Sequence, residues 1–382
     1  MRLVFLSNFL TVHQIPFCEF MYQKLGDGFC FVATQEIEAE RLTQGYSDLN
    51  HQYPFVIRSY ESEEEMERAQ KLTDDADVVV IGSAPMEFLQ RRLSERKLTF
   101  LYSERLYKSG CQVWKFPVRI FKFYKKYTRH KSFYLLCASA FTAGDFAKTG
   151  TFLGRTYKWG YFPKTCQYDD VNAMIENKAP GTILWAARFI DWKHPEYVVE
   201  VARRLKAEGY DFQIKMLGSG DRWDGIANMV RQAGLENHVQ LTGAIPAEEV
   251  RKFMDAASIF LFTSDKEEGW GAVLNESMNS GCAVVASDAI GAVPYLLRHG
   301  ENGLQFKSGD VDELHNKVKY LLDNPEVCAS MGQKAYGTIT ELWNAETAAE
   351  RLLELANALM QGEKRPNLYE SGPCSKAEIL KG

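Results

Sequence analysis

The sequence predicts an α/β protein with two doubly wound domains, each built on a parallel sheet. Short apolar runs alternate with longer amphipathic runs, and most of the short runs are apolar throughout. Strands that helices cover on both faces have this pattern. The alternation occurs twice in 382 residues, a length that suits two domains better than one core. Ligands are therefore expected at the carboxyl ends of the strands, in a cleft between the domains.

The individual elements follow from these runs. Strands are expected in the first half at 3–6, 29–33, 55–57, 78–81, 99–102 and 133–137. Strands are expected in the second half at 183–187, 213–217, 239–242, 259–263, 283–286 and 304–306. Crossover helices are expected at 196–208, 223–233, 248–256 and 312–323.

A polar stretch without periodicity, 161–182, separates the two sets of strands and contains two prolines. It places the first domain at 1–165, a linker at 166–181 and the second domain at 182–345. The remaining segment, 346–382, is expected to be a helix and a polar tail that cross back to the first domain.

The composition excludes several classes of protein. Hydrophobic residues make up 46% and charged residues 25% of the chain, as in soluble globular proteins. No apolar run reaches the roughly 18 residues of a membrane span, and the apolar start of the chain is too short for a signal peptide. The net charge of −5 and the lack of an RNA-binding motif argue against a nucleic-acid partner. Eight cysteines without a CxxC pair are typical of reduced thiols in a cytosolic protein.

Two acids flank a predicted strand-to-helix turn in the second half. Glu268 and Glu276 are eight positions apart, and Gly271 between them permits unusual backbone angles. The amides near Val273 and Leu274 would begin the helix, where a phosphate is favoured. The two acids could bracket a phosphate-bearing ligand, or they could be an acid near a helix start and a solvated helix residue. Spacing alone leaves both interpretations open.

Basic residues follow the first strand of the second domain. Arg188 and Lys193 come after the strand at 183–187, and Pro195 suits the first position of the next helix. Two cations at the carboxyl end of a strand suit a polyphosphate, although an ordinary solvated loop would look the same. Gly218 lies in "LGSGD", which lacks a complete dinucleotide fingerprint and indicates only that a nucleotide could approach the backbone.

The motifs become more specific when they are taken in order. The series is "AARFIDWKH", "LGSGD", "VQLTGAIPAEEV", "EEGWGAVLNESMNSG", "GENGLQFKSGD" and "ELWNAETAAERLLEL". In this order the motifs resemble those of the family 4 retaining glycosyltransferases, which have the GT-B fold of two Rossmann-like domains. The resemblance covers about 180–355 and implies that 182–345 binds the donor, whereas 1–165 forms the acceptor side.

The resemblance also implies an activity. A sugar would pass from a UDP- or GDP-linked nucleotide sugar to a hydroxyl of a glycan or lipid-linked acceptor, in polysaccharide or glycolipid assembly. The anomeric configuration would be retained, with no obligatory metal. A nucleotide-sugar epimerase, a phosphorylase on the same fold and a catalytically idle sugar-nucleotide-binding subunit remain as alternatives.

Roles carry over from the family to matching positions. Glu268 would contact hydroxyls of the donor sugar, and Glu276 would hold the ribose. Arg188 and Lys193 would neutralise the diphosphate that leaves, and the amides near Val273 and Leu274 would bind its phosphates. The donor-binding set is completed by the motif glycines Gly218, Gly243 and Gly271.

The first domain departs from the family pattern. Many members have a Gly-Gly loop after the first strand, whereas "SNFLTVHQIPF" contains no glycine. A histidine often follows the strand at 99–102, and this chain has Glu104 and Arg105 there. His13, Glu104 and Arg105 are therefore candidate acceptor-side or catalytic groups. His13 could equally be a helix cap or a packed side chain.

One segment of the first domain is strongly basic. Residues 105–144 contain nine Lys or Arg and no acid, and 114–131 mixes seven of these cations with aromatic residues. Three interpretations stay open: contact with an anionic membrane surface, the flank of a basic helix, or a groove for an anionic acceptor. The first interpretation predicts a cytoplasmic protein that is peripheral on the inner face of the membrane.

Overall fold

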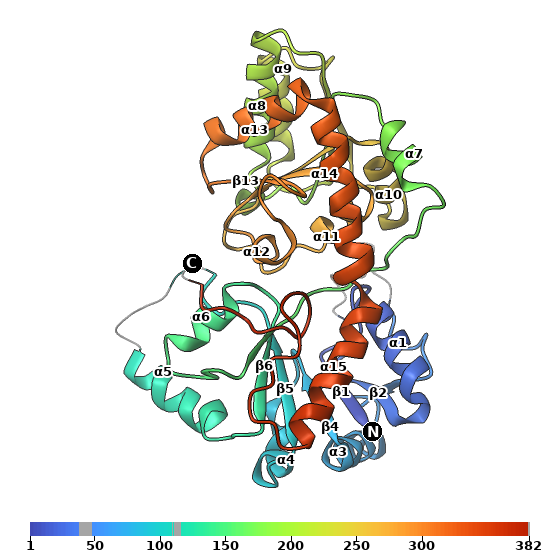
Figure 1. Cartoon of the computed structure of the whole chain (residues 1–382), viewed down its shortest axis with the longest axis vertical. Coiled ribbons are helices and arrows are strands. Elements are labelled where there is room, and N and C mark those ends of the chain that lie inside the picture. The colour runs from blue at the N-terminus through green and yellow to red at the C-terminus, as the bar shows by residue number, and fades with distance from the viewer. Residues whose placement is uncertain (38–47, 109, 111–115, 381–382) are drawn as a thin grey trace. The chain divides into compact units, whose positions relative to one another are not determined.

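The computed structural model describes residues 1–37, 48–108, 110 and 116–380. The chain forms two compact units (Figure 1). Unit 1 comprises Met1–Lys164 and Asn344–Gly382, and unit 2 comprises Thr165–Trp343. Trp114 and Lys115, the first residues of the predicted basic stretch 114–131, lie outside the described residues.

Unit 1 contains a seven-stranded parallel sheet with the order β3-β2-β1-β4-β5-β6-β7. Its strands are β1 (Leu3–Ser7), β2 (Phe29–Ala33), β3 (Val56–Arg58), β4 (Val78–Ile81), β5 (Leu98–Ser103), β6 (Phe133–Cys137) and β7 (Thr156–Lys158). Its helices are α1 (Ile15–Leu25), α3 (Glu63–Asp75), α4 (Gln90–Ser94), α5 (Phe116–Phe123), α6 (Thr142–Ala147) and α15 (Ala345–Met360). The described part of unit 1 also contains short 3-10 helices η1 (Gly26–Gly28) and η2 (Met86–Leu89) and a π-helical turn η4 (Tyr124–Thr128).

Unit 2 contains a six-stranded parallel sheet with the order β10-β9-β8-β11-β12-β13. Its strands are β8 (Thr182–Ala186), β9 (Gln213–Leu217), β10 (Val239–Gly243), β11 (Ile259–Phe262), β12 (Ala283–Ser287) and β13 (Leu304–Phe306). Its α-helices are α7 (Val171–Glu176), α8 (Pro195–Ala207), α9 (Trp223–Gln232), α10 (Ala247–Ala256), α11 (Val273–Asn279), α12 (Val293–Leu296), α13 (Val311–Asp323) and α14 (Pro325–Gly337). A 3-10 turn η5 (Asp191–Lys193) and a π-helical segment η6 (Thr338–Leu342) complete it.

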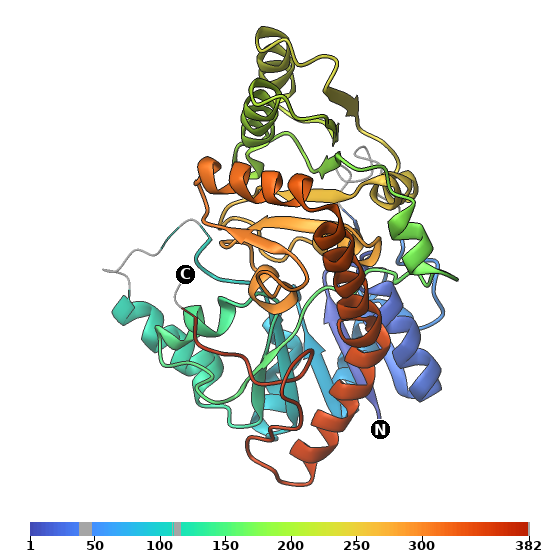
Figure 2. The same cartoon turned by 45° about the horizontal axis from the view of Figure 1, so that its top comes forward.

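Alternation along the strands explains why each sheet is covered twice. In unit 2, Trp185 of β8 and Leu261 of β11 pack in one core with residues of α8, α9 and α13. Their neighbours Leu184 and Phe260 are buried on the opposite face, where α10 contacts β8, α11 contacts β12, and the two helices contact each other. Side chains that follow one another along a strand point to opposite faces, so an apolar strand requires helices on both. Figure 2 shows these layers from a second direction.

The predicted fold class, two doubly wound α/β domains with parallel sheets, is confirmed. Every predicted strand and crossover helix is present within one residue of its predicted ends. Several elements of the structure were not predicted, among them β7 and α7. β7 has only three residues, and the stretch 166–181, described above as a linker without periodicity, contains α7 and is part of unit 2. Within the described part of the chain, no helix has the length and apolar character needed to cross a bilayer.

The C-terminal tail lies along the free edge of β7. The Lys158 N–H donates to the Ser375 carbonyl (2.7 Å), and the Lys158 carbonyl accepts from the Cys374 N–H (2.8 Å). The Ala377 N–H donates to the Thr156 carbonyl (3.2 Å), which continues this antiparallel pairing. The tail therefore occupies backbone groups that an edge strand would otherwise leave unpaired.

Candidate functional site

The predicted donor residues of unit 2 lie where its sheet changes direction. The strand order runs outward from β8 through β9 to β10 on one side and from β11 to β13 on the other, and β8 pairs directly with β11. Ligands of such sheets bind outside the carboxyl ends of these two strands. Arg188 and Lys193 follow β8, and Glu268 follows β11. The structure thus brings the loops that carry these three residues to one edge.

Lys193 and Glu268 form an ion pair between these loops. The Lys193 Nζ contacts the Glu268 Oε2, and the Ser264 hydroxyl donates to the same oxygen (3.1 Å). Each of the two charged side chains is only 11% exposed. The Lys193 ammonium also lies 4.2 Å from the centre of the Trp192 ring. The stability of such a buried ion pair depends on both partners, because removal of either would leave the other charge buried without compensation.

The backbone around the pair is held by hydrogen bonds. The Thr263 hydroxyl donates to the Lys193 carbonyl (2.6 Å), and the buried Trp185 indole N–H donates to the Thr263 hydroxyl (2.9 Å). The Asp265 N–H donates to the Trp192 carbonyl (3.0 Å). The two loops are therefore joined at backbone level, and the positions of Lys193 and Glu268 are fixed by the fold.

His194 supports the same loops and was not singled out from the sequence. Its ring nitrogens lie 2.9 Å from Glu196 Oε1 and 3.1 Å from Asp265 Oδ2. The hydrogen bond to Glu196 and that to Asp265 raise the pKa of His194. The residue has a left-handed backbone (φ +50°) directly before Pro195, the first residue of α8. That conformation is uncommon for a residue with a side chain, and the sequence contains no signal for it.

The side chains of Arg188 and Glu276 form no hydrogen bond or ion pair with the residues that the structure describes. Arg188 is exposed and forms no ion pair with the described residues. Glu276 is the fourth residue of α11 and lies in its first turn. Burial raises the pKa of the Glu276 carboxyl, and Arg251 acts in the opposite direction. A carboxylate with this raised pKa would gain from hydroxyl donors, such as those of a sugar.

The start of α11 differs from the prediction at the Leu274 amide, which was expected to bind a phosphate. Gly271 has φ +86°, and a Cβ at this position would lie 2.3 Å from the Phe262 ring. Glycine is therefore required here. The Leu274 N–H donates to the Gly271 carbonyl (3.0 Å), so this amide is engaged within the turn. The Val273 amide is at the first position of the helix.

Gly218 and Gly243 end neighbouring strands of the same sheet. Gly218 has φ +128°, and its N–H donates to the Gly243 carbonyl (2.9 Å). A Cβ on Gly218 would lie 1.9 Å from the Ala187 carbonyl oxygen, while a Cβ on Gly243 (φ +76°) would meet no atom within 4 Å. The turn after β9 is therefore packed against the backbone that leads to Arg188.

This difference predicts unequal effects of two alanine substitutions. Gly243→Ala is expected to lower the free energy of unfolding by about 1–2 kcal/mol, the cost of left-handed backbone for a residue with a Cβ. Gly218→Ala carries a comparable strain and a collision with the Ala187 carbonyl, so a loss above about 3 kcal/mol is expected. Urea unfolding of both variants measures the difference. Equal losses would contradict the close approach at Gly218.

In unit 1 the acceptor-side candidates His13 and Glu104 share a contact with Tyr161. The His13 ring stacks on the Tyr161 ring (5.3 Å between centres, 11° between planes). The Tyr161 hydroxyl donates to Glu104 Oε1 (2.5 Å), and Lys108 pairs with the other oxygen of Glu104 (2.6 Å). These residues follow strands β1, β7 and β5, so they lie at the carboxyl edge of the sheet. Tyr161 was missed, because an aromatic residue in a loop has no distinguishing pattern.

Arg105 occupies a different place. Its guanidinium is buried, lies 3.8 Å from Asp145 Oδ2 and packs over the Phe141 ring (4.8 Å to its centre). The same carboxylate accepts from the Leu106 and Tyr107 amides. Arg105 therefore contributes to the packing of unit 1, and its position does not support the predicted acceptor-side role.

His13 provides a pH-dependent test of its surroundings. Burial lowers its pKa from 6.5 to about 4, with Glu104 opposing the shift. The unfolded chain takes up a proton near pH 6.5 and the folded chain only near pH 4, so acid favours unfolding in this interval. The free energy of unfolding should therefore fall from pH 6.5 to pH 4, and His13→Gln should reduce that slope. His51→Gln, at an exposed histidine, is the control. An unchanged slope in His13→Gln would show that His13 does not lie in this environment.

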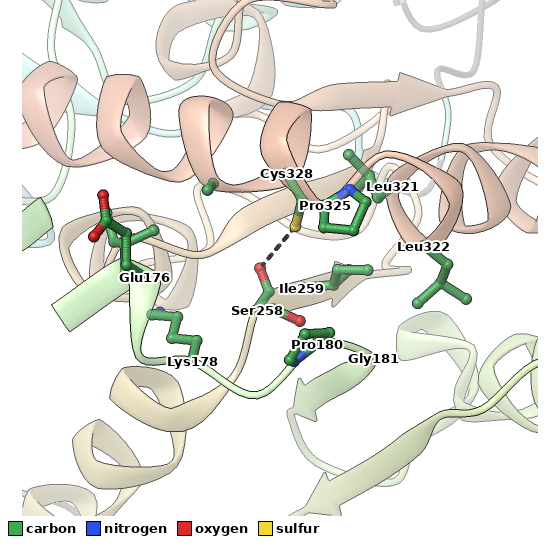
Figure 3. Close-up of a pocket in the computed structure, with 13 residues that line it drawn as sticks. Glu176, Lys178, Pro180, Gly181, Ser258, Ile259, Leu321, Leu322, Pro325 and Cys328 are labelled. Carbon is green, nitrogen blue, oxygen red and sulfur yellow. Dashed lines mark hydrogen bonds between the residues drawn. The ribbon is translucent and has the colours of Figure 1, made fainter. Parts of the chain in front are cut away.

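A pocket of about 130 Å³ lies elsewhere in unit 2 (Figure 3). It is lined by residues at the amino-terminal ends of β8 and β11, including Gly181 and Ser258, and by Cys328 of α14. The Lys178 ammonium is already satisfied by the carbonyls of Met254, Ala257 and Ser280. The pocket is smaller than ordinary small-molecule sites and is at the opposite edge of the sheet from Lys193 and Glu268.

The positive groups at the predicted donor site come from side chains. Across the described residues, no three side chains of His, Cys, Asp or Glu are grouped so that they could hold a metal ion. The positive charge at the ends of β8 and β11 is supplied by Arg188 and Lys193. Metal-independent catalysis remains a prediction.

Comparison with known proteins identifies this part of the chain. Residues 170–338 match the family model described as glycosyl transferases group 1. A Haemophilus influenzae protein described as an uncharacterized glycosyltransferase is 26% identical over 193 residues, which are 50% of this chain and 51% of that protein. The amylovoran biosynthesis glycosyltransferase AmsK of Erwinia amylovora is 33% identical over 185 residues, 47% of this chain and 45% of AmsK. The chain thus spans about half the length of these relatives.

The fold is similar over a longer region. The crystal structure of Anabaena HepE in complex with UDP superposes with a TM-score of 0.69 and 16% identity, and covers 94% of this chain and 100% of that one. The match includes both doubly wound units, which is the GT-B architecture. Residues 170–338 therefore belong to the group 1 glycosyltransferases, and the chain has the GT-B fold.

Proposed function

We propose that the protein transfers a sugar from a nucleotide diphosphate sugar to a hydroxyl of a glycan or lipid-linked acceptor, with retention of the anomeric configuration. The observation that carries this proposal is the buried Lys193–Glu268 pair at the carboxyl ends of β8 and β11. It is joined in the same loops by the exposed cation Arg188. A fixed acid beside two cations suits a sugar attached to a diphosphate.

In this proposal the chemistry follows from charge. As the bond between the anomeric carbon and the diphosphate oxygen breaks, negative charge grows on the diphosphate. Arg188 and Lys193 stabilise that charge without rearrangement, because the fold already holds their loops. Glu268 contacts hydroxyls of the sugar, Glu276 holds the ribose, and the amide of Val273 contributes a donor to the phosphates. Gly218, Gly243 and Gly271 permit close approach to the backbone.

The acceptor side is proposed to include His13 and Glu104 of unit 1. Because the pKa of His13 is lowered to about 4, its ring is neutral at pH 7 and can accept or donate a hydrogen bond. Its Nδ1 is buried and has no hydrogen-bond partner among the residues described. A neutral imidazole and a carboxylate are suitable partners for acceptor hydroxyls. Arg105, which is buried beside Asp145, is left out of the proposed acceptor side.

The printed names of similar proteins support a proposal for the donor and the setting. HepE was solved with UDP, and AmsK is named for amylovoran biosynthesis. We therefore propose a UDP-sugar as the first donor to test, with a GDP-sugar as the second, and polysaccharide or glycolipid assembly at the cytoplasmic face of the membrane as the setting.

A thermal-shift series followed by a hydrolysis assay tests this function. UDP, GDP and ADP are compared at equal concentration, because a ligand raises the unfolding temperature of the state that it binds. The diphosphate that gives the largest shift identifies the donor class, and release of that diphosphate from its sugar is then measured. We expect a shift with UDP or GDP and slow hydrolysis of the matching UDP- or GDP-sugar. No shift with any diphosphate would overturn the proposal.

The same assay separates the alternatives. An idle binding subunit would bind a diphosphate without releasing it from any sugar. An epimerase would change the sugar without a hydroxyl acceptor, and a phosphorylase would require inorganic phosphate and show the absorbance of pyridoxal phosphate.

A further inference from the structure

Helix α5 and the π-helical turn η4 present apolar side chains to solvent. We call residues 116–131 the basic segment. Among its large hydrophobic residues, Val118 is 72%, Phe121 61%, Tyr124 55% and Ile120 45% exposed. No residue of α5 is buried. Figures 1 and 2 show α5 at the outer edge of unit 1, beside α6. Exposed apolar residues that cluster in this way mark interaction surfaces.

The segment has three faces along its helix. Phe123 and Tyr127 point inward and contact Phe146 of α6, which anchors the segment to unit 1. Val118, Phe121 and Tyr124 follow at intervals of three residues and, at about 100° per residue, form an outer apolar row. The Lys122 and Lys126 side chains are four residues apart and form a basic row next to it.

Three lysines of this segment are not compensated by a nearby acid. Lys122, Lys125 and Lys126 form no ion pair with any residue that the structure describes. The nearest acids along the chain are already engaged, because Glu104 pairs with Lys108 and Asp145 with Lys148. Lys125 covers part of the Phe121 ring (4.4 Å to its centre), which places charge directly beside the apolar row.

An apolar row beside a basic row fits one partner best. We propose that the basic segment binds an anionic lipid bilayer, with Val118, Phe121 and Tyr124 in the headgroup region and the lysines at the anionic headgroups. Amphipathic helices with a basic polar face lie in the bilayer interface in this way. A nucleic acid would use the lysines but not the aliphatic row, and a second protein copy would use the row but not the uncompensated charge. The proposal deepens the proposed function, because it places the enzyme where a lipid-linked acceptor is found.

Sedimentation with vesicles tests this partner on the full chain. The protein is mixed with two kinds of vesicle. One kind contains phosphatidylcholine alone, and in the other about one third of the lipid is anionic phosphatidylglycerol. We expect binding to the anionic vesicles only, weakened by salt. Lys122→Gln/Lys125→Gln/Lys126→Gln should weaken it on the order of 100-fold, at roughly fivefold for each cation. Val118→Ser/Phe121→Ser should weaken it about tenfold or more.

Matched variants control for charge and for exposed apolar area. Lys71→Gln/Lys252→Gln/Lys364→Gln removes the same charge from exposed lysines elsewhere. Met66→Ser/Tyr320→Ser removes exposed apolar side chains outside the segment. Both should bind like the unaltered protein. The proposal is overturned by failure to bind anionic vesicles at low salt, by equal binding to neutral vesicles, or by equal losses in test and control variants. Self-association that the segment variants abolish would also overturn it.

Binding and chemistry remain distinguishable in this design. Release of the diphosphate from a soluble nucleotide sugar should be the same in the segment variants as in the unaltered protein, because no basic-segment residue is placed at the donor site. Vesicle binding without any such release would sink the proposed function and leave the membrane surface standing. The opposite result would leave the proposed function standing and sink the membrane surface.

Discussion

Replacement of Glu268 by glutamine is expected to reduce sugar transfer about 1,000-fold while UDP or GDP binds within a few fold of the unaltered protein. Glu268 carries two proposed tasks. Its carboxylate contacts the donor sugar, and it holds the Lys193 ammonium in place through the ion pair. Glutamine preserves the size of the side chain but removes its charge, so Lys193 is no longer directed. Initial rates with saturating donor, and calorimetry with the diphosphate alone, measure the two quantities.

Two controls make this result interpretable. Glu267→Gln changes a neighbouring acid in the same loop and should retain nearly full turnover. Urea unfolding shows how much of the loss is due to stability, because Lys193 would be left buried without its charged partner. Unchanged turnover in a folded Glu268→Gln variant would remove Glu268 from the catalytic site.

Alanine at Arg188 or Lys193 is expected to lower kcat about 100-fold in each case, with a much smaller loss of donor affinity. The negative charge that these cations meet is larger in the transition state than in the bound donor, so turnover suffers more than binding. The two variants should differ in stability. Arg188 is exposed and unpaired within the described chain, whereas loss of Lys193 strands Glu268 and should cost about 3–5 kcal/mol.

Conservative replacements sharpen this test. Arg188→Lys retains the charge but loses the planar fork, so it should recover part of the turnover. Lys206→Ala removes an exposed cation of α8 and should leave kcat unaltered. A loss of donor affinity that matches the loss of kcat/KM, with kcat unchanged, would contradict transition-state stabilisation by Arg188 and Lys193.

The regular part of the fold could be predicted because burial on both faces leaves a direct record in the sequence. Strands such as β4 and β11 are apolar throughout, and Pro195 at the start of α8 occupies the predicted first position. β7 could not be predicted, since three residues show no periodicity and part of its pairing comes from a tail more than 200 residues later. α7 is also too short to show a helical pattern within its polar stretch.

The sequence predicted which residues belong to the candidate site but not which contacts they make with one another. Spacing indicated that Glu268 and Lys193 follow parallel strands, but their ion pair depends on how two loops bend. The same limit applies to Arg105, because Asp145, which buries it, comes from a different element. Tyr161 and His194 were missed since their roles arise from contacts across loops. The types and order of the residues predicted the family, whereas the contacts between side chains of different loops became known only from the structure.

The tail along β7 has a consequence for synthesis of the chain. Unit 1 contains both the first and the last parts of the sequence, whereas unit 2 is continuous. On the ribosome, unit 2 can complete its sheet while the edge of β7 still lacks Cys374–Ala377. Until those residues emerge, the nascent chain carries an open strand edge that can pair with another chain. The unit that begins first on the ribosome is therefore the last to be completed.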